Sequence, residues 1–533
     1  MTPPDLEPPI EPDSEPAELT GTVVRGAGLA GAGYIFAQVI TLGFYVALAR
    51  LASPQDFGDL AAGTLLVNVG LLFSESGMLA ALIHRKDRVD EAASTVAVAT
   101  LISGVGLTLL ALATAPLIAL LFDNHKAGEV AAASCGLLLL RSLRVVPDAL
   151  LQRRFSFLRR IVIEPAGVVV FGIGAVIACA NGLGVWGLLI GYYASGIVDV
   201  FLGWALVGWR PRLRAASIAM WRELIGYGRH IVASTALQTV EQQTPVVLLG
   251  RFVGTGALGQ FRYAARMEST AGSIVVQAAS YVLFPALSRI TSDRGRFRDA
   301  CLRSVRSMST IGFPLGLLLV PLGVPAAVIA FGAVWKDAGY AAMALSVMMA
   351  GGTLISFASE TLKADGRPDI LARIRVVNLI ATLIFMGALL PFHLVGVCAG
   401  LSIGTLLGAV YAMVKVSECL EIGALRLTRE ILPSAAAAIF MVAVLTPLQF
   451  LLIDASSHGT ALGLVLLTAE AVLGIALYLA ALRVLAPDGF RELISLARRM
   501  LRRGGAERED QDPSSEPPPT PGGGKTPDQA TVQ

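Results

Sequence analysis

Several side chains that could bind a polar ligand lie inside long apolar stretches of this 533-residue chain. Glu241, Gln242 and Gln238 fall on one face of a predicted helix, because helical neighbours are three or four residues apart. A charged side chain at the centre of a bilayer costs about 2.5 to 3.5 kcal/mol, so such residues face protein or water. We therefore expect these three side chains, together with Gln38, to line a polar cavity.

Arginine side chains could supply contacts to an anionic group, because a guanidinium forms paired hydrogen bonds with phosphate oxygens. The candidates are Arg50, Arg251, Arg262 and Arg266 near one face of the predicted membrane, and Arg141 and Arg144 near the other. Other roles stay open for four of them. Arg141 and Arg144 could anchor a helix at the interface. Arg50 and Arg251 could cap helix ends.

Two carboxylates are candidates for ion coupling. Glu241 and Asp199 both lie deep in apolar stretches. For Glu241 the alternative is an interhelical hydrogen bond or ion pair, and for Asp199 it is a pair with an arginine.

The elements that must position these residues are membrane-spanning helices. A hydrocarbon core about 30 Å thick needs roughly 20 apolar residues to cross it. The chain is 55% hydrophobic and 15% charged, a composition typical of an integral membrane protein. About fourteen stretches reach the required length: 26–49, 60–82, 93–122, 130–150, 161–180, 184–206, 231–249, 270–287, 308–331, 341–362, 376–392, 396–414, 431–453 and 461–484. The prediction is an all-α polytopic membrane protein.

Lysine and arginine gather in alternate gaps between these stretches. The gap after the second stretch holds Arg85, Lys86 and Arg88, whereas the gap after the first holds only Arg50. Cytoplasmic loops collect Lys and Arg, so both termini are expected in the cytoplasm. The net charge of +3 is spread over these gaps. Membrane lipids are therefore the expected partners of the basic residues, and nucleic acid is not.

A short repeat indicates that the helices form two related halves. Arg50 and Gly58 in RLASPQDFG have the same spacing as Arg251 and Gly259 in RFVGTGALG. Many transporters are built from duplicated helical units. We therefore predict two six-helix bundles around a central cavity, followed by a further helix pair.

The predicted organisation is a disordered acidic tail at 1–20, the first bundle at 21–210, an interfacial linker at 211–230, the second bundle at 231–420, the extra helix pair at 421–487, an amphipathic basic helix at 488–503 and a disordered tail at 504–533. The acidic start is the reverse of a signal peptide, so no cleavage is expected.

The motifs resemble those of a known family. The segments ALARLASPQDFGDLAA at 47–62 and ESGMLAALIHR at 75–85 resemble the opening signature of the polysaccharide transporter family, the Wzx-like oligosaccharide flippases. Further matches are PDALLQRRFSFLRR at 147–160, LGVWGL at 183–188, LLGRFVGTGALGQF at 248–261 and FPLGL at 313–317. The resemblance implies membership of the multidrug/oligosaccharidyl-lipid/polysaccharide exporter superfamily, and with it two six-helix bundles and two additional C-terminal helices.

The resemblance also implies a function, namely flipping of an undecaprenyl-pyrophosphate-linked oligosaccharide across the bacterial inner membrane for exopolysaccharide, capsule or O-antigen biosynthesis. A polymerase and a chain-length regulator are further candidate partners. Such a substrate needs a polar path, because polar groups stripped of water cost several kcal/mol each. Two alternatives within the superfamily stay open, a drug or cation antiporter and a peptidoglycan-precursor flippase. One departure is Pro245, which stands where relatives often carry an aspartate.

Residue types typical of enzymes are sparse. The five cysteines form no CxxC motif, and the histidines form no HExxH motif. The only D-x-D motif is Asp510 and Asp512 in the predicted tail. No metal and no cofactor are expected, and a membrane-embedded polymerase or glycosyltransferase is the less favoured interpretation.

Overall fold

The computed structural model describes residues 38–74, 76–85, 87–153, 162–288, 293–453, 455, 459–487 and 489–491. Every regular element within these ranges is helical, so the all-α prediction is confirmed. The tails predicted at 1–20 and 504–533 lie outside the described residues. So does nearly all of the basic helix predicted at 488–503.

The first half of the chain contains a helix at Gln38–Leu51, followed by α2 (Pro54–Gly63), α3 (Leu65–Ser74), α4 (Ser76–His84), α5 (Val89–Phe122), α6 (His125–Ser134), α7 (Gly136–Arg153), α8 (Glu164–Ala180) and α9 (Val185–Val207). The second half contains α10 (Ile218–Phe252), α11 (Thr255–Ser288), α12 (Arg294–Leu317), α13 (Leu319–Phe331), α14 (Lys336–Ala364), α15 (Pro368–Leu389) and α16 (His393–Leu420). The last two helices are α17 (Ala424–Pro447) and α18 (Thr460–Leu485), with the π-helix η5 (Leu448–Ile453) after α17.

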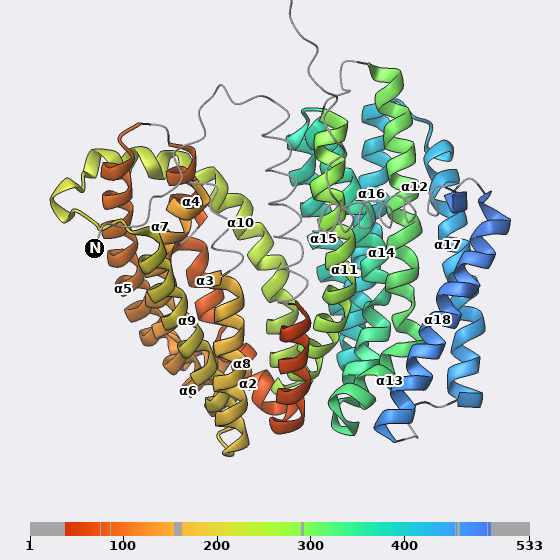
Figure 1. Ribbon diagram of the computed structural model, residues 1–533, viewed down its shortest axis with the longest axis horizontal. Helices are drawn as coiled ribbons and strands as arrows, with labels where there is room; N and C mark the ends of the chain where they lie inside the picture. Colours follow the sequence, from red (N-terminus) through yellow and green to blue (C-terminus); the bar gives the residue numbers. More distant parts are fainter. Residues whose placement is uncertain are drawn as a thin grey trace, which may run out of the picture.

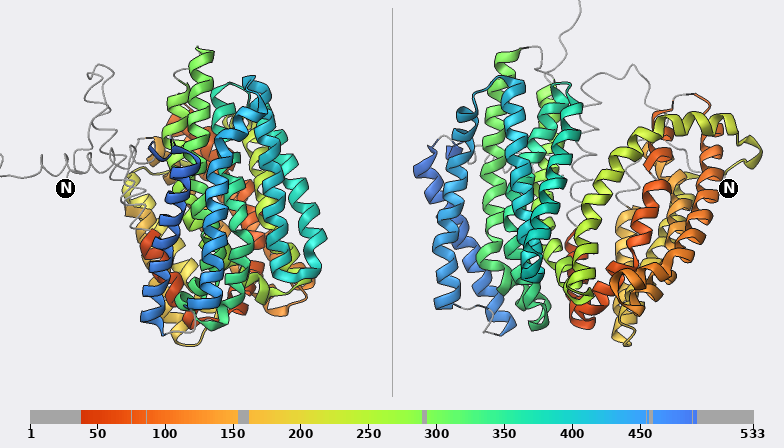
Figure 2. Two further views of the ribbon diagram at one scale, coloured as in Figure 1. Left: turned by 90° about the vertical axis from the view of Figure 1, so that its right-hand side faces the viewer. Right: turned by 180° about the vertical axis from the view of Figure 1, so that it is seen from behind.

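The two halves form a V. Figure 1 shows α3 to α9 on the left and α11 to α18 on the right, meeting at the lower end near α2 and separating at the upper end. The view from behind in Figure 2 shows the same separation. The terminal helices α17 and α18 pack on α12 and α13 at the outer edge of the second half.

The predicted number of spans is not confirmed. In the described part of the chain, eight helical runs are long and apolar enough to cross a membrane, or nine if α12 and α13, bent by 48°, form one span. One of these runs, Asp369–Leu420, contains both α15 and α16, which pack against each other. The helices Gln38–Leu51 and α8 are short, and α10 and α11 carry polar side chains that lower their hydropathy.

The segment predicted as a linker at 211–230 is largely helical. A short 3-10 turn at Leu213–Ala215 precedes α10, which begins at Ile218. The predicted domain boundary at residue 230 therefore lies within α10, and this one helix leads from the first half to the second.

The two repeated glycines meet where the halves join. A Cβ atom added to Gly58 would lie 1.6 Å from the Thr255 carbonyl oxygen, and one added to Gly259 would lie 1.8 Å from the Pro54 carbonyl oxygen. Only glycine, which has no Cβ, allows two backbones to approach so closely. The matching segments of α2 and α11 thus cross backbone to backbone at the closed end of the V.

The terminal helix pair contains a buried carboxylate. Glu470 of α18 is 2% exposed. With its amide nitrogen turned toward this carboxylate, Gln449 donates to both oxygens, at 2.6 and 2.5 Å. This pair satisfies a buried charge between η5 and α18, as buried polar groups require.

Candidate substrate cavity

A cavity of about 840 Å³ lies between the two halves. The helix Gln38–Leu51, α2, α8 and α9 contribute one wall, and α10, α11, α14, α15 and α16 contribute the other. The lining extends from Phe57 and Tyr263, near the crossing of α2 and α11, to Lys363 and Arg375, near the loop between α14 and α15. The cavity therefore runs along the opening of the V and ends at the crossing.

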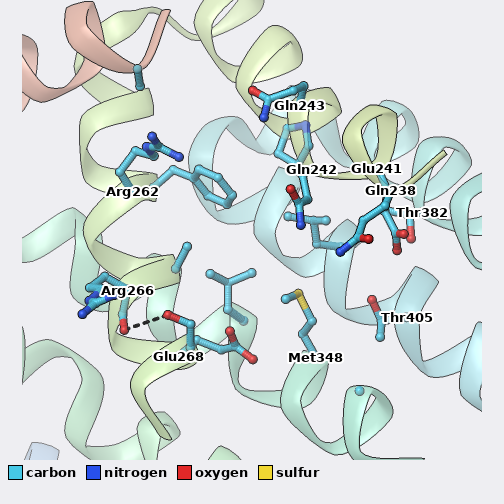
Figure 3. Close-up of a pocket in the computed structure, with 18 of the residues that line it drawn as sticks. Gln238, Glu241, Gln242, Gln243, Arg262, Arg266, Glu268, Met348, Thr382 and Thr405 are labelled. Carbon is cyan, nitrogen blue, oxygen red and sulfur yellow. Dashed lines mark hydrogen bonds between the residues drawn. The ribbon is translucent and has the colours of Figure 1, made fainter. Parts of the chain in front are cut away.

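One wall is formed by the predicted polar face of α10. Gln238, Glu241 and Gln242 all line the cavity, and Figure 3 shows them across from α11. Asn378 Nδ2 donates a hydrogen bond of 2.6 Å to Glu241 Oε1, which joins α10 to α15. Pro245 lies one turn later and is buried. Because proline has no N–H, the Glu241 carbonyl lacks the hydrogen bond that residue 245 would otherwise donate.

The opposite wall carries cations from α11. Arg262 lines the cavity and is exposed to it. Arg266 reaches the first half, where its Nη2 donates to Gln38 Oε1 at 3.3 Å. Its guanidinium also lies 5.0 Å from the centre of the Tyr45 ring. Arg266 and Gln38 thus form a contact between the halves, whereas Arg262 faces the open space.

A smaller cavity of about 370 Å³ lies within the first half. Arg141, Arg144 and Asp199 line it. Arg144 forms ion pairs with Asp148 at 2.8 Å and with Asp199 at 2.6 Å. The pair with Asp199 matches the alternative of an arginine partner for this carboxylate. Arg262 lines both cavities, so the two spaces share a wall.

Two predicted arginines lie outside both cavities. Arg50 donates to the Ile329 carbonyl at 3.0 Å and to the Ala330 carbonyl at 3.3 Å, near the end of α13. Arg251 lies at the end of α10, is exposed and lines neither space. The last carbonyls of a helix need donors from outside it, so capping accounts for Arg50. Neither arginine lines either cavity in this structure, and the contacts of Arg50 match the capping alternative.

Sequence reasoning missed several polar residues of the cavity, among them Glu268, Lys363, Arg375 and Asn378. Glu268 of α11 is 8% exposed and lines the large cavity. The hydropathy window placed the span at 270–287, whereas α11 begins at Thr255. Helical spacing did not point to it, because Glu268 follows Arg266 by two and Arg262 by six positions, and neither spacing places residues on one face of a helix.

Aromatic residues close the cavity at the crossing. The Tyr263 ring lies 4.9 Å from the Phe57 ring and 3.9 Å from the Trp335 ring, measured between centroids. Tyr263 donates to the Tyr45 carbonyl at 3.1 Å, and Trp335 Nε1 donates to the Ala49 carbonyl at 2.8 Å. Each bond joins the second half to the first.

A polar layer lies beyond the aromatic one. Thr255 Oγ1 of α11 accepts hydrogen bonds from Gln55 and, at 3.0 Å, from Asn124, both in the first half. Asn124 Nδ2 also donates to Asp59 Oδ1 at 2.8 Å, and Asp59 is 1% exposed. The aromatic and polar layers together seal this end of the molecule.

Solved structures share the fold. The lipid II flippase MurJ in an inward closed conformation superimposes with a TM-score of 0.70 at 15% identity, covering 87% of this chain and 99% of that one. An inward-facing multidrug resistance MATE family transporter of the MOP superfamily gives a TM-score of 0.56 at 17% identity, covering 72% and 96%. These likenesses show that this chain shares the fold of those two proteins.

Sequence relatives are transport and biosynthesis proteins for polysaccharides. The succinoglycan biosynthesis transport protein ExoT of Rhizobium meliloti (strain 1021) is 25% identical over 343 residues, 63% of this chain and 68% of the relative. The teichuronic acid biosynthesis protein TuaB of Bacillus subtilis (strain 168) is 22% identical over 303 residues, 56% of this chain and 62% of the relative, which is less than two thirds of its length. The predicted resemblance is confirmed, and the similar proteins include a transport protein, a flippase and a multidrug transporter. Because the model of the polysaccharide biosynthesis protein family matches residues 47–339, the chain belongs to that family.

Proposed function

We propose that this protein flips an undecaprenyl-pyrophosphate-linked oligosaccharide across the bacterial inner membrane by alternating access. The observation that carries the proposal is the cavity between the halves, which has amides and a carboxylate on α10 and arginines on α11. A hydrated sugar and an anionic headgroup need such a wall, because neither crosses hydrocarbon without polar partners.

The two walls would bind different parts of the substrate. Arg262, with Arg141 in the adjoining cavity, supplies positive charge for the pyrophosphate. Gln238, Gln242 and Glu241 offer donors and acceptors to sugar hydroxyls. The polyprenyl tail stays in lipid while the headgroup passes between the halves.

The charge pattern gives the direction. The starts of α10 and α12 lie at the open end of the V, and they follow gaps rich in arginine. By the positive-inside rule this end faces the cytoplasm, and so do both termini. The described conformation would then receive substrate from the cytoplasmic leaflet. Parting of α2 from α11 would release it on the other side.

Ion coupling is part of the proposal. Glu241 is held by Asn378 and Asp199 by Arg144, so a cation or proton at either carboxylate would change a contact between helices. A polymerase and a chain-length regulator are the assembly proteins we expect beside the flippase.

The substrates of the alternative transporters would interact with this cavity differently. A cationic drug would be repelled by Arg262 and Arg141, which disfavours a drug or cation antiporter. A peptidoglycan precursor carries a similar lipid diphosphate, so it is the second candidate, and the family membership favours the polysaccharide.

Deletion of the gene tests the function. Cells without the protein should accumulate a lipid-linked glycan on the cytoplasmic leaflet, and the wild-type gene should restore export. Mass spectrometry of the accumulated lipid would identify the sugar. Equal access of that glycan to a periplasmic probe with and without the protein would refute the proposal.

A further inference from the structure

The large cavity is lined by Glu241, Glu268 and Glu360, and the proposed function does not use Glu268. Glu268 lies on α11, and Figure 3 shows it across the cavity from Glu241 and Gln242. It is only 8% exposed, although it borders a space large enough for a ligand. Gly272, one turn later, lies beside it, since a Cβ there would be 3.8 Å from Glu268 Oε1.

Glu241 and Glu268 differ in their hydrogen-bond partners. Glu241 accepts a hydrogen bond of 2.6 Å from Asn378. Among the side chains that the structure describes, none donates a hydrogen bond to Glu268 or forms an ion pair with it. Glu268 is thus the less satisfied of the two groups.

The charged groups around the cavity do not neutralise Glu268 directly. They are Glu241 on α10, Arg262 and Arg266 on α11 itself, Glu360 and Lys363 on α14, and Arg375 on α15, with the phenols of Tyr45, Tyr192 and Tyr263. Lys363 pairs with Glu360 at 3.0 Å, and Arg266 is bound to Gln38. The neighbouring α2 and α16 contribute Phe57, Leu60, Ala61, Leu401 and Thr405, none of which titrates, and α12 contributes no lining residue among those described.

An ionised carboxylate in such a place is unfavourable unless it gains a hydrogen bond, a counter-charge or a proton. A metal ion would need several oxygen ligands together. Within the described residues, no group of three or more acidic, histidine or cysteine side chains is arranged to hold one. A single proton is the smallest change that satisfies the group.

We propose that Glu268 is a proton-binding site whose protonation is coupled to binding of the anionic headgroup. This inference rests on the proposed function for its ligand. A proton from water on the open side converts the carboxylate to a neutral acid and removes the negative charge that faces the incoming anion. By linkage, binding of the anion favours the protonated acid to the same extent, so anion and proton would enter together. The proton returns to water when the cavity opens on the other side.

Infrared difference spectroscopy on the purified full chain in nanodiscs tests proton binding without any substrate. A step from alkaline to acidic buffer should produce a protonated-carboxyl band that is absent in Glu268→Gln. Glu470→Gln is the matched control, because Glu470 is also buried but lies outside the cavity, where Gln449 holds it. An unchanged band in Glu268→Gln would overturn the proposal, and so would suppression of the wild-type band by sodium ions.

Binding of inorganic pyrophosphate tests the coupling. Acidification should raise the wild-type affinity by about five- to 150-fold, the range typical of coupled sites. Glu268→Gln, which mimics the neutral acid, should bind pyrophosphate well at both pH values, and Glu268→Asp should restore the pH dependence. The same pH dependence in wild type and Glu268→Gln would contradict the coupling. Neither experiment uses a lipid-linked sugar, so a failure to flip such a lipid would refute the proposed function separately.

Discussion

Substitution of Gly58 by alanine should weaken the seal between the two halves. The added Cβ would lie 1.6 Å from the Thr255 carbonyl oxygen and 2.4 Å from its carbon. Non-bonded heavy atoms prefer separations of about 3.5 Å, so α2 and α11 would have to move apart by roughly 2 Å. Overpacking of this kind costs about 1 to 3 kcal/mol, which shifts a two-state equilibrium by about five- to 150-fold. The sealed conformation should lose population by that factor.

Distances between spin labels would measure this shift. Labels at Leu183, in the loop before α9, and at Val334, in η3 (Ala333–Trp335), report on opposite halves, and both sites are exposed. In a cysteine-free background, Gly58→Ala should add a population with a longer distance. Gly259→Ala should act in the same way, because its Cβ would meet the Pro54 carbonyl.

A matched control separates the contact from the general effect of removing a glycine. Gly106 lies within α5, and a Cβ there would meet no atom within 4 Å. Alanine at this site should leave the distance distribution unchanged and stabilise the helix by about 0.5 to 1 kcal/mol. If Gly58→Ala gave the same distances and the same thermal stability as Gly106→Ala, the reasoning about the crossing would be refuted.

Three further substitutions probe the cavity and its surroundings. Arg262→Ala should weaken binding of inorganic pyrophosphate by about ten- to 150-fold, because a hydrogen bond to a charged group contributes about 1.5 to 3 kcal/mol. Wild-type affinity measured by calorimetry would argue against an anion site. Asn378→Ala leaves Glu241 without its hydrogen-bond donor, so it should lower the free energy of unfolding by about 1 to 3 kcal/mol and slow transport. An unchanged melting temperature and transport rate would contradict the role of Asn378 in holding Glu241. Glu470→Ala should destabilise the protein by a similar amount, because Gln449 loses its hydrogen-bond acceptor. The transport rate per folded molecule should stay at the wild-type level. A reduced transport rate with normal stability would place Glu470 in the transport path.

Much of the fold follows from patterns visible in the sequence. Hydropathy predicts the helices, and the spacing of Gln238, Glu241 and Gln242 predicts that they share a face, because both properties are local. The repeat around Gly58 and Gly259 indicated duplication, and the structure shows that the repeated segments contact each other. Apolar length alone did not give the number of spans, since α10 and α11 combine membrane length with the polar residues of the cavity.

The site was predicted less completely, because its contacts join residues far apart in the chain. Asn378 and Glu241 are separated by 137 positions, and no local pattern pairs them. Arg50 and Arg251 were candidates for the cavity because of their charge, with capping of helix ends as the alternative. Their places at helix ends depend on where neighbouring helices finish, as the contact of Arg50 with the end of α13 shows.

Transbilayer movement of a lipid-linked sugar is the most direct test of the central claim that the cavity carries a headgroup across the membrane. Purified protein would be reconstituted in vesicles with an undecaprenyl-diphosphate oligosaccharide, and an impermeant glycosidase would be added outside. The account predicts that sugar from the inner leaflet becomes accessible far faster than in protein-free vesicles, and that Arg262→Ala slows this exchange. Equal rates with and without the protein would contradict it.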